Sequence, residues 1–192
     1  SPRTHGRARA RGDPMLPLLT RAAARDADRH AIETLGVPGV VLMENAGRGA
    51  FDVVVREHAG LLERVVLVGG PGQNGGDAWV LARHLHRIGH APTAVLVVPQ
   101  GDVGQLAGDA RINWDVLAPL GVCTRVLAPE QVAELGEALR AASLIVDGVF
   151  GTGLTREVTT WAGVIHAMND AAAPKVALDL PSGVDADTGA VL

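Results

Sequence analysis

Hydrophobic residues recur along this chain with two different periods. Between residues 18 and 58 they return every three or four positions, as on one face of an α-helix, and Gly36 interrupts them. From residue 64 onward, short continuous runs of Val, Leu and Ile alternate with longer stretches of helical period. Such runs are typical of parallel strands that are buried on both faces. The pattern predicts an α/β fold, a three-layer Rossmann-like parallel sheet with helices on both faces.

The same pattern gives approximate bounds for each element. The predicted helices cover residues 18–35, 38–58, 77–88, 106–118, 129–141 and 157–172. The predicted strands cover residues 64–69, 92–98, 122–127, 143–147 and 175–180. Thr20 is the expected N-cap of the first helix. The second helix is expected to pack through an apolar face made of Leu42, Ala46, Ala50, Val53 and Val54.

Composition and charge narrow the class of protein. A length of 192 residues with 47% hydrophobic residues suits one domain with a sizeable core. The net charge of −4 argues against nucleic acid as a main partner. No run approaches the roughly 18 apolar residues that a membrane span needs. Residues 1–14 carry four arginines and one aspartate, and we expect a disordered tail there, with the domain over residues 15–192.

The two ends of this domain and its single cysteine lead to further expectations. The chain stops after a turn-like segment at residues 185–189 with nothing to cap the sheet, so we expect the domain to be C-terminally incomplete. Because Cys123 is the single cysteine, the chain can form neither an intrachain disulfide nor a thiolate cluster, and this fits a cytoplasmic location. Its apolar surroundings at residues 122–127 predict a core position rather than a nucleophile.

Three turns that follow predicted strands carry the candidate chemistry. The first is the glycine-rich turn over residues 70–77, after which a helix is expected to begin at or near Asp77. The other two begin with Asp147 and Asp179, each at the end of an apolar strand. Because the carboxyl ends of parallel strands gather at one edge of a sheet, we expect the three turns to form one site. Free N–H groups at a helix N-terminus would favour an anionic ligand there.

Each turn also has a purely structural interpretation. Gly70, Gly72 and Gly75 match the spacing of a dinucleotide fingerprint, but the second predicted strand does not end in the acid that binds a ribose hydroxyl. Pro71 also removes one N–H donor. The glycines could simply allow a tight turn, and a lone aspartate at a strand end often binds loop amides only. The histidines lack metal-ligand spacing and are expected to be solvated or to cap helices.

Four segments in order resemble the NAD(P)H-hydrate epimerase family, that is, the YjeF N-terminal domain. They are residues 42–47 (LMENAG), 70–77 (GPGQNGGD), 147–153 (DGVFGTG) and 179–183 (DLPSG). The resemblance implies interconversion of the R and S epimers at C6 of hydrated NADH or NADPH (NAD(P)HX). A separate dehydratase could then repair the S form. Many bacterial members of the family resemble a fusion with such a dehydratase. The first two predicted helices of this chain are amphipathic, which is also compatible with a homodimer.

The resemblance also implies a set of site residues. The positions that match substrate-binding residues are Gln73, Asn74, Gly75, Gly76, Asp77, Gly151, Thr152, Gly153, Leu154, Thr155, Arg156, Glu157 and Asp179. Gln73 stands where the family has an asparagine. The positions that match ligands of a potassium ion are Asn74, Asp147 and Ser182. Their amide, carboxylate and hydroxyl oxygens are the ligands that a hard cation prefers.

We expect Asp179 to act as the catalytic general acid or base, because it is not needed for the cation. Two other functions stay open at this stage. A non-catalytic nucleotide-binding or scaffold module could use the same fold. An NAD-dependent oxidoreductase is disfavoured by the missing acid at the end of the second strand. Glu44, Asn45 and Arg48 of the second helix could form a solvated face or take a ligand or interface role.

Overall fold

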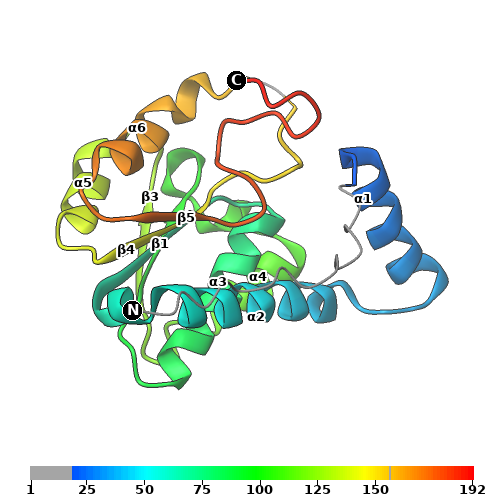
Figure 1. Ribbon diagram of the computed structural model, residues 1–192, viewed down its shortest axis with the longest axis horizontal. Coiled ribbons are helices and arrows are strands. Elements are labelled where there is room, and N and C mark those ends of the chain that lie inside the picture. Colours follow the sequence, from blue (N-terminus) through cyan, green and yellow to red (C-terminus); the bar gives the residue numbers. More distant parts are fainter. Residues whose placement is uncertain (1–18, 156) are drawn as a thin grey trace, which may run out of the picture.

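A computed structural model describes residues 19–155 and 157–192 of the protein. The predicted disordered tail over residues 1–14 and the predicted site residue Arg156 lie outside this described part. Within it, five parallel strands form one sheet in the order β3-β2-β1-β4-β5 (Figure 1). The strands are β1 (Val65–Gly69), β2 (Thr93–Val97), β3 (Cys123–Leu127), β4 (Leu144–Gly148) and β5 (Lys175–Ala177).

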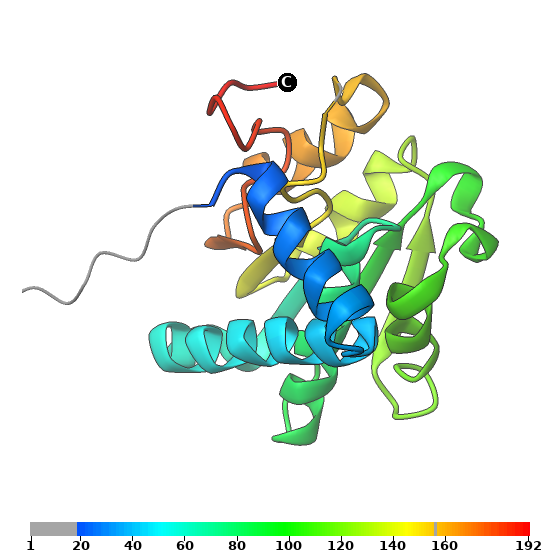
Figure 2. The same ribbon diagram turned by 90° about the vertical axis from the view of Figure 1, so that its right-hand side faces the viewer.

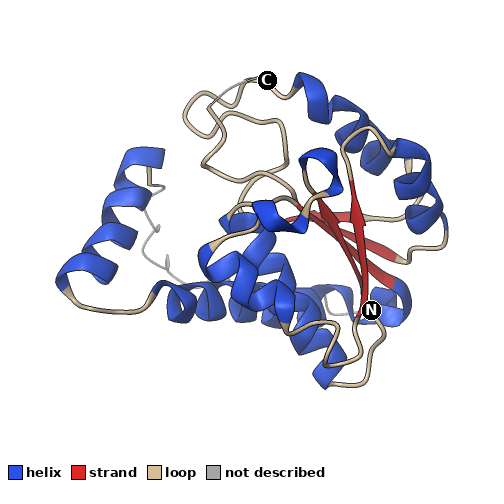
Figure 3. Ribbon diagram, turned by 180° about the vertical axis from the view of Figure 1, so that it is seen from behind, coloured by secondary structure: helices blue, strands red, loops and turns tan. Residues whose placement is uncertain are grey.

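Helices cover both faces of this sheet, as Figure 3 shows. One face packs against α2 (Gly39–His58), α3 (Gln73–Arg87) and α4 (Gly108–Asp115). The other packs against α5 (Val132–Arg140) and α6 (Ala162–Asp170). Side chains alternate across a strand, so Leu67 of β1 enters the first core and Val68 the second. The predicted three-layer α/β architecture is confirmed.

The remaining helices are short, except for α1 (Arg21–Arg29), which continues into the π-helical turn η1 (His30–Thr34). The 3-10 turns are η2 (Ala59–Arg64), η3 (Pro99–Gly101), η4 (Val103–Gln105) and η5 (Thr159–Trp161). The predicted N-cap is confirmed, because Thr20 Oγ1 accepts a hydrogen bond from the Ala23 N–H at 3.2 Å. No residue of α1 is buried. Figure 2 shows α1 lying across the molecule in front of the C-terminal segment.

Two predicted helices begin at the wrong residue. Helix α3 begins at Gln73 rather than near Asp77, because the residues after Gly72 are already helical. Helix α6 begins only at Ala162, after the turn η5, whereas we predicted a helix from residue 157. Strand β5 is shorter than predicted and ends at Ala177. Other element ends agree with the predictions to within three residues.

Two predictions about burial are also wrong. Cys123 is exposed rather than part of the core, because β3 is an edge strand that pairs with β2 alone. In α2, the buried residues are Met43, Gly47 and Val54, whereas Val53 of the predicted face is 44% exposed. A side-chain Cβ on Gly47 would lie 2.4 Å from the Val80 Cβ, so close contact with α3 determines which face of α2 turns inward.

Candidate functional site

The sheet register brings the three predicted turns together. Gly69 at the end of β1 lies opposite Gly148 at the end of β4, and Asp147 lies opposite Ala177 of β5. Hydrogen bonds continue this pairing beyond the strands, from the Gly70 N–H to the Gly148 carbonyl at 3.3 Å. The chain reverses its direction of winding between β1 and β4, which is where open α/β sheets bind ligands. The prediction that the turns share one edge of the sheet is therefore confirmed.

Glycines in the first turn let backbone segments approach very closely. A Cβ on Gly75 would lie 2.0 Å from the Gly70 carbonyl oxygen, and a Cβ on Gly70 would lie 2.5 Å from that of Val149. Gly72 has nothing within 4 Å of its own Cβ position. The glycines at 70 and 75 are therefore required by packing, and the first turn of α3 lies against the β4 turn.

A buried polar cluster joins the second turn to the third. Asp147 is 9% exposed and accepts hydrogen bonds from the Ser182 hydroxyl at 2.6 Å and the Ser182 N–H at 2.9 Å. It also accepts one from the Val149 N–H at 3.1 Å. Burial raises the pKa of the Asp147 carboxyl, and the bonds from Ser182 and Val149 oppose that rise.

Asn74 reaches the same cluster from α3. Its amide nitrogen donates to the Phe150 carbonyl at 2.9 Å, and the Phe150 N–H donates to the Ser182 hydroxyl at 2.8 Å. The amide oxygen of Asn74 is buried and has no hydrogen-bond partner in residues 19–155 and 157–192. A buried acceptor without a donor is costly, and a cation would satisfy it. The three predicted cation ligands thus lie in one cluster, in which they supply an amide, a carboxylate and a hydroxyl oxygen.

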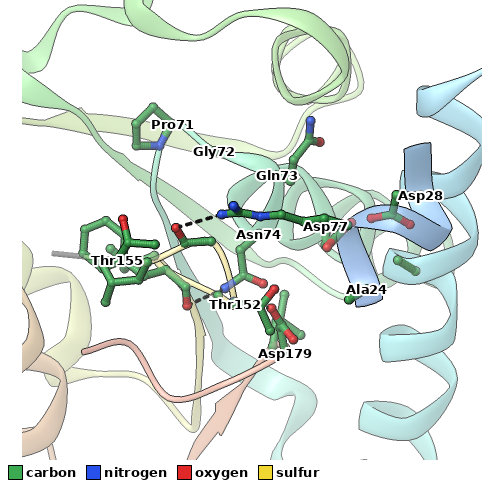
Figure 4. A pocket seen from close by; sticks show the side chains of 18 of the residues that line it. Ala24, Asp28, Pro71, Gly72, Gln73, Asn74, Asp77, Thr152, Thr155 and Asp179 are labelled. Atoms are coloured by element: carbon green, nitrogen blue, oxygen red, sulfur yellow. Dashed lines mark hydrogen bonds between the residues drawn. The ribbon is translucent and has the colours of Figure 1, made fainter. Parts of the chain in front are cut away.

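A pocket of ≈ 970 Å³ opens beside this cluster (Figure 4). Its lining comes from the first turn of α3, from the loop after β4, from α2 and from α1. The residues are Ala24, Arg25, Asp28, Ala46, Ala50, Pro71, Gly72, Gln73, Asn74, Asp77, Val149, Phe150, Gly151, Thr152, Gly153, Leu154, Thr155, Leu178 and Asp179. Most predicted substrate residues therefore line one cavity.

Four predicted residues line the pocket less directly or lie outside it. Gly75 and Gly76 are buried in the first turn of α3, where they contribute backbone shape rather than pocket surface. Glu157 is exposed and lies beyond the lining residues. Gln73 lines the pocket, but its side chain points away from Asn74 and Asp179 in Figure 4.

Two carboxylates of the pocket have unusual surroundings. Burial raises the pKa of Asp77 to about 7, and the charges of Asp179 and Asp28 add to the effect. Asp179 lies in the left-handed backbone region with φ 62°, which an aspartate tolerates better than most residues. Its Oδ2 accepts the Thr152 N–H at 2.6 Å. A Cβ on Gly151 would lie 2.4 Å from the same oxygen, so this turn needs glycine there.

Helix α1 supplies a wall of the pocket that the sequence did not predict. Arg25 donates to the Gly153 carbonyl at 3.4 Å, and Asp28 lies one helical turn further on. Arg21 anchors the start of the helix through an ion pair with Asp185 at 2.6 Å. Arg21 and Thr188 hold the pKa of Asp185 below its usual range. The sequence feature that could have indicated this wall is a helix with an alanine-rich face that also carries Arg25 and Asp28, three positions apart.

The polar face of α2 has a structural role at Glu44. This carboxylate bonds to His84 Nε2 at 2.8 Å and forms an ion pair with Arg83, which ties α2 to α3. Burial opposes ionisation of Glu44, but His84 and Arg83 outweigh it and lower its pKa. His84 is 7% exposed, so its predicted solvated or capping role is wrong. Asn45 and Arg48 are exposed.

Comparisons with known proteins agree with this geometry. A family model described as YjeF-related protein N-terminus matches residues 39–192. The chain belongs to this family. It is 35% identical over 175 residues to an NAD(P)H-hydrate epimerase of Rhodopirellula baltica, covering 91% of this chain and 68% of the relative. It is 38% identical over 180 residues to an NAD(P)H-hydrate epimerase of Levilactobacillus brevis, covering 93% and 78%.

Other matches extend the picture of this YjeF-related domain. It is 39% identical over 166 residues to the bifunctional NAD(P)H-hydrate repair enzyme Nnr of Thermofilum pendens, of which it covers only 31%. A crystal structure of the yeast protein ynu0 has the same fold, with a TM-score of 0.72 at 24% identity. The match covers 88% of this chain and 72% of the yeast chain. No helix in the described part of the YjeF-related domain combines the length and the hydropathy needed to cross a bilayer.

Proposed function

We propose that this protein interconverts the R and S epimers of hydrated NADH and NADPH, as part of nicotinamide cofactor repair. The observation that carries the proposal is the pocket, in which the strand-end carboxylate Asp179 and the helix carboxylate Asp77 face one cavity. Membership of the YjeF-related family and relatives that are named NAD(P)H-hydrate epimerase support it. The reaction is an isomerisation, so it consumes no oxidant or reductant.

The lining of the pocket suggests how the substrate lies. The loop over residues 151–155 presents backbone groups and two hydroxyls, and Arg25 is the cation beside it. Phosphates prefer such N–H groups and a guanidinium. Asp77 of α3 faces the same cavity, and Asp179 lies beside the loop, where its Oδ2 accepts the Thr152 N–H. Both carboxyl groups can form hydrogen bonds with the hydroxyl and carboxamide groups of the hydrated nicotinamide nucleoside, so we place the ring against Asp77 and Asp179 and the phosphates against the rest of the loop and Arg25.

A direct assay tests the activity. The R epimer is incubated with the protein, and formation of the S epimer is followed by chromatography and by coupling to an S-specific dehydratase. We expect turnover by the wild type and a loss of at least about tenfold for Asp179→Asn, because the side chain would lose its ability to exchange a proton. Asp170→Asn, an exposed change at the end of α6, should keep full activity.

The same assay distinguishes the rival function. Tight binding of the hydrated nucleotide without conversion of either epimer would contradict the epimerase proposal and favour a non-catalytic binding module. Normal turnover by Asp179→Asn would leave the epimerase function intact but would remove Asp179 from its assigned role.

A potassium ion forms a second part of the proposal. Asn74 Oδ1, the Asp147 carboxylate and the Ser182 hydroxyl are oxygen donors around one buried cluster, and the first has no hydrogen-bond partner among the described residues. A bound cation would satisfy this acceptor and supply positive charge beside the phosphate-facing loop. We expect potassium to raise the melting temperature more than lithium at equal ionic strength. Asn74→Ala should abolish this difference, and a difference that survives the substitution would contradict the assignment.

Three further features of the proposal concern context. The bifunctional relatives suggest that this domain works together with a dehydratase, whether fused to it or separate. A homodimer is also proposed, and light scattering of the purified protein at several concentrations tests it. A cytoplasmic location stays a prediction that rests on the single cysteine, Cys123.

A further inference from the structure

The carboxylates of the pocket come from three separate parts of the chain. Asp77 lies in the first turn of α3, Asp179 follows β5, and Asp28 lies on α1. Figure 4 shows the side chains of Asp28 and Asp77 directed toward each other across the cavity. Residues 39–192 match the family model, so the helix that carries Asp28 precedes the matched segment. No role follows for Asp28 from the motifs in the sequence.

The charged groups around Asp77 are few in the part of the chain that the structure describes. Helix α1 contributes Arg25 and Asp28, and the segment after β5 contributes Asp179. Helix α2 faces the pocket with Ala46 and Ala50, which carry no charge. The Arg25 guanidinium is engaged with the Gly153 carbonyl at 3.4 Å. Besides burial, the charges that raise the pKa of Asp77 are those of Asp179 and, with a smaller effect, Asp28.

Asp28 is exposed and Asp77 is half-buried, and a negative charge beside a half-buried carboxyl group favours the protonated form of that group. The two acids of the reaction pocket then differ in their surroundings. Asp179 accepts a backbone N–H from Thr152, whereas no hydrogen-bond donor to the Asp77 side chain is found among the described residues. Environments that differ in this way separate an acid from a base within one site.

We propose that Asp28 is a positioning residue of the epimerase reaction: its negative charge, carried into the pocket by α1, keeps the proton on Asp77, which is the general acid at the C6 hydroxyl. The inference rests on the proposed function. Protonated Asp77 gives its proton to the C6 hydroxyl, and the C6–O bond breaks with its electron pair going to oxygen, so that water leaves. The ring nitrogen supplies electrons to C6. Water then adds to the opposite face of C6 and gives its proton to Asp179, and exchange with solvent removes that proton from Asp179 and returns one to Asp77.

The charge of Asp28 adds to the effect of burial on the pKa of Asp77. The pocket is open enough to admit a dinucleotide, so solvent reaches Asp77 before the substrate binds. A second negative charge opposite Asp77 holds the proton in place in this open state. The pKa of Asp77, raised to about 7, agrees with a group that donates and regains a proton near neutral pH.

The test compares Asp28→Asn with Asp26→Asn. Asp26 lies on the same helix and pairs with Arg29 on the exposed side, so its substitution makes the same change in net charge outside the pocket. The first readout needs no substrate: the pKa of the Asp77 carboxyl is measured by carbon-detected NMR titration. We expect Asp28→Asn to lower that pKa by about one unit and Asp26→Asn to leave it unchanged.

The second readout is the pH profile of epimerisation. With Asp28→Asn, the decline of activity on the alkaline side should move about one unit toward lower pH. Activity well above neutral pH should then fall by about tenfold. Asp28→Glu keeps the charge and should restore most of the wild-type profile. Hydrogen exchange of the α1 amides checks that the helix keeps its place in each variant.

The outcomes separate this inference from the proposed function. An Asp77 pKa that is the same in the wild type and in Asp28→Asn would overturn the inference, whatever the activity. A profile that moves equally with Asp26→Asn would also overturn it, because a general charge effect would then be the cause. A wild-type protein that converts no epimer, although the Asp77 pKa responds to Asp28, would refute the proposed function and leave the electrostatic coupling standing.

Discussion

The two walls of the pocket are built in opposite ways. On the sheet side, the pocket lies against the buried residues Asp147, Ser182 and Asn74, which hydrogen bonds join through the backbone of Phe150. On the other side, α1 has no buried residue, and among the described residues Arg21 and Arg25 make the hydrogen bonds and ion pairs that join it to the rest of the chain. The first wall is part of the core, whereas the second is attached to the surface.

This difference suggests that the two walls have different functions. A wall that is continuous with the core holds its groups in fixed positions, which suits a cation site and a phosphate loop. A wall held by ion pairs opens at low free-energy cost, which suits entry and release of a large nucleotide. The comparison predicts that substitutions on the sheet side change global stability, and that substitutions on α1 change local opening and substrate affinity.

The largest effect is expected at Gly75. A methyl group there would meet the Gly70 carbonyl oxygen at 2.0 Å, so the backbone of the turn must shift. We expect Gly75→Ala to lower the free energy of unfolding by about 3 kcal/mol in urea denaturation. Gly72→Ala is the matched control, because nothing lies within 4 Å of its Cβ position, and it should change stability by less than about 0.5 kcal/mol. Equal stability of the two variants would show that the sheet-side wall is not rigid.

The second effect concerns the pH dependence of stability. The pKa of Asp77 is raised from 3.8 to about 7, so the folded state holds a proton that the unfolded state has already lost over this range. This contribution is complete below pH 3.8 and disappears as pH rises through about 7. With allowance for solvent in the open pocket, the loss amounts to about 2 kcal/mol.

Asp77→Asn should therefore flatten the curve of unfolding free energy between pH 4 and 7. It should also be more stable than the wild type at pH 8. Urea denaturation at several pH values measures both, and Asp170→Asn serves as a control at an exposed carboxylate. A wild-type curve that rises with pH across this window, compared with Asp77→Asn, would contradict the raised pKa.

The third effect is expected at Ser182. Its hydroxyl donates to Asp147 at 2.6 Å and accepts from the Phe150 N–H at 2.8 Å. Ser182→Ala leaves that N–H without its partner and should cost about 1.5 kcal/mol in urea denaturation. Thr188→Ala removes a hydroxyl from an exposed turn and should cost less than Ser182→Ala. The reverse order would mean that the buried cluster contributes little to stability.

The smallest change in global stability is expected at Arg21, on the opposite wall. Arg21→Ala removes the ion pair with Asp185 and should lower the global free energy of unfolding by less than Ser182→Ala does. Hydrogen exchange of the α1 amides should nevertheless become clearly faster, and the KM for the hydrated nucleotide should rise. Arg29→Ala breaks only an exposed pair within α1 and should leave the KM unchanged. Slow exchange in Arg21→Ala would show that α1 is held by other contacts.

The sequence predicted one of these walls and missed the other, for a physical reason. Asp147 and Asp179 follow continuous apolar runs, and parallel strands bring their ends together, so the shared edge could be inferred before the structure was known. Asp28 and Arg25 lie on a helix whose period fits a surface helix as well as a pocket wall. The periodicity places them on a helix but does not say where that helix lies.

The errors in the predicted elements have a similar origin. Glycine lowers helix propensity, so the first turn of α3, with Gly75 and Gly76, was expected to be a loop. Contacts with Gly70 and Met43 override that preference, since both glycines are packed too tightly for a side chain. Cys123 was assigned to the core because its neighbours are apolar, but the position of β3 at the sheet edge is a property of topology, which local composition does not encode.

The exposed Cys123 has a practical consequence for the oligomer. It stands at the first residue of β3, at the amino end of the sheet and therefore opposite the pocket edge. Since the chain has one cysteine, a disulfide between two copies can join only Cys123 to Cys123. Such a disulfide would lie at the outer edge of the sheet, at the end of β3 away from the pocket. The same thiol accepts a single fluorophore at a defined site, remote from the chemistry.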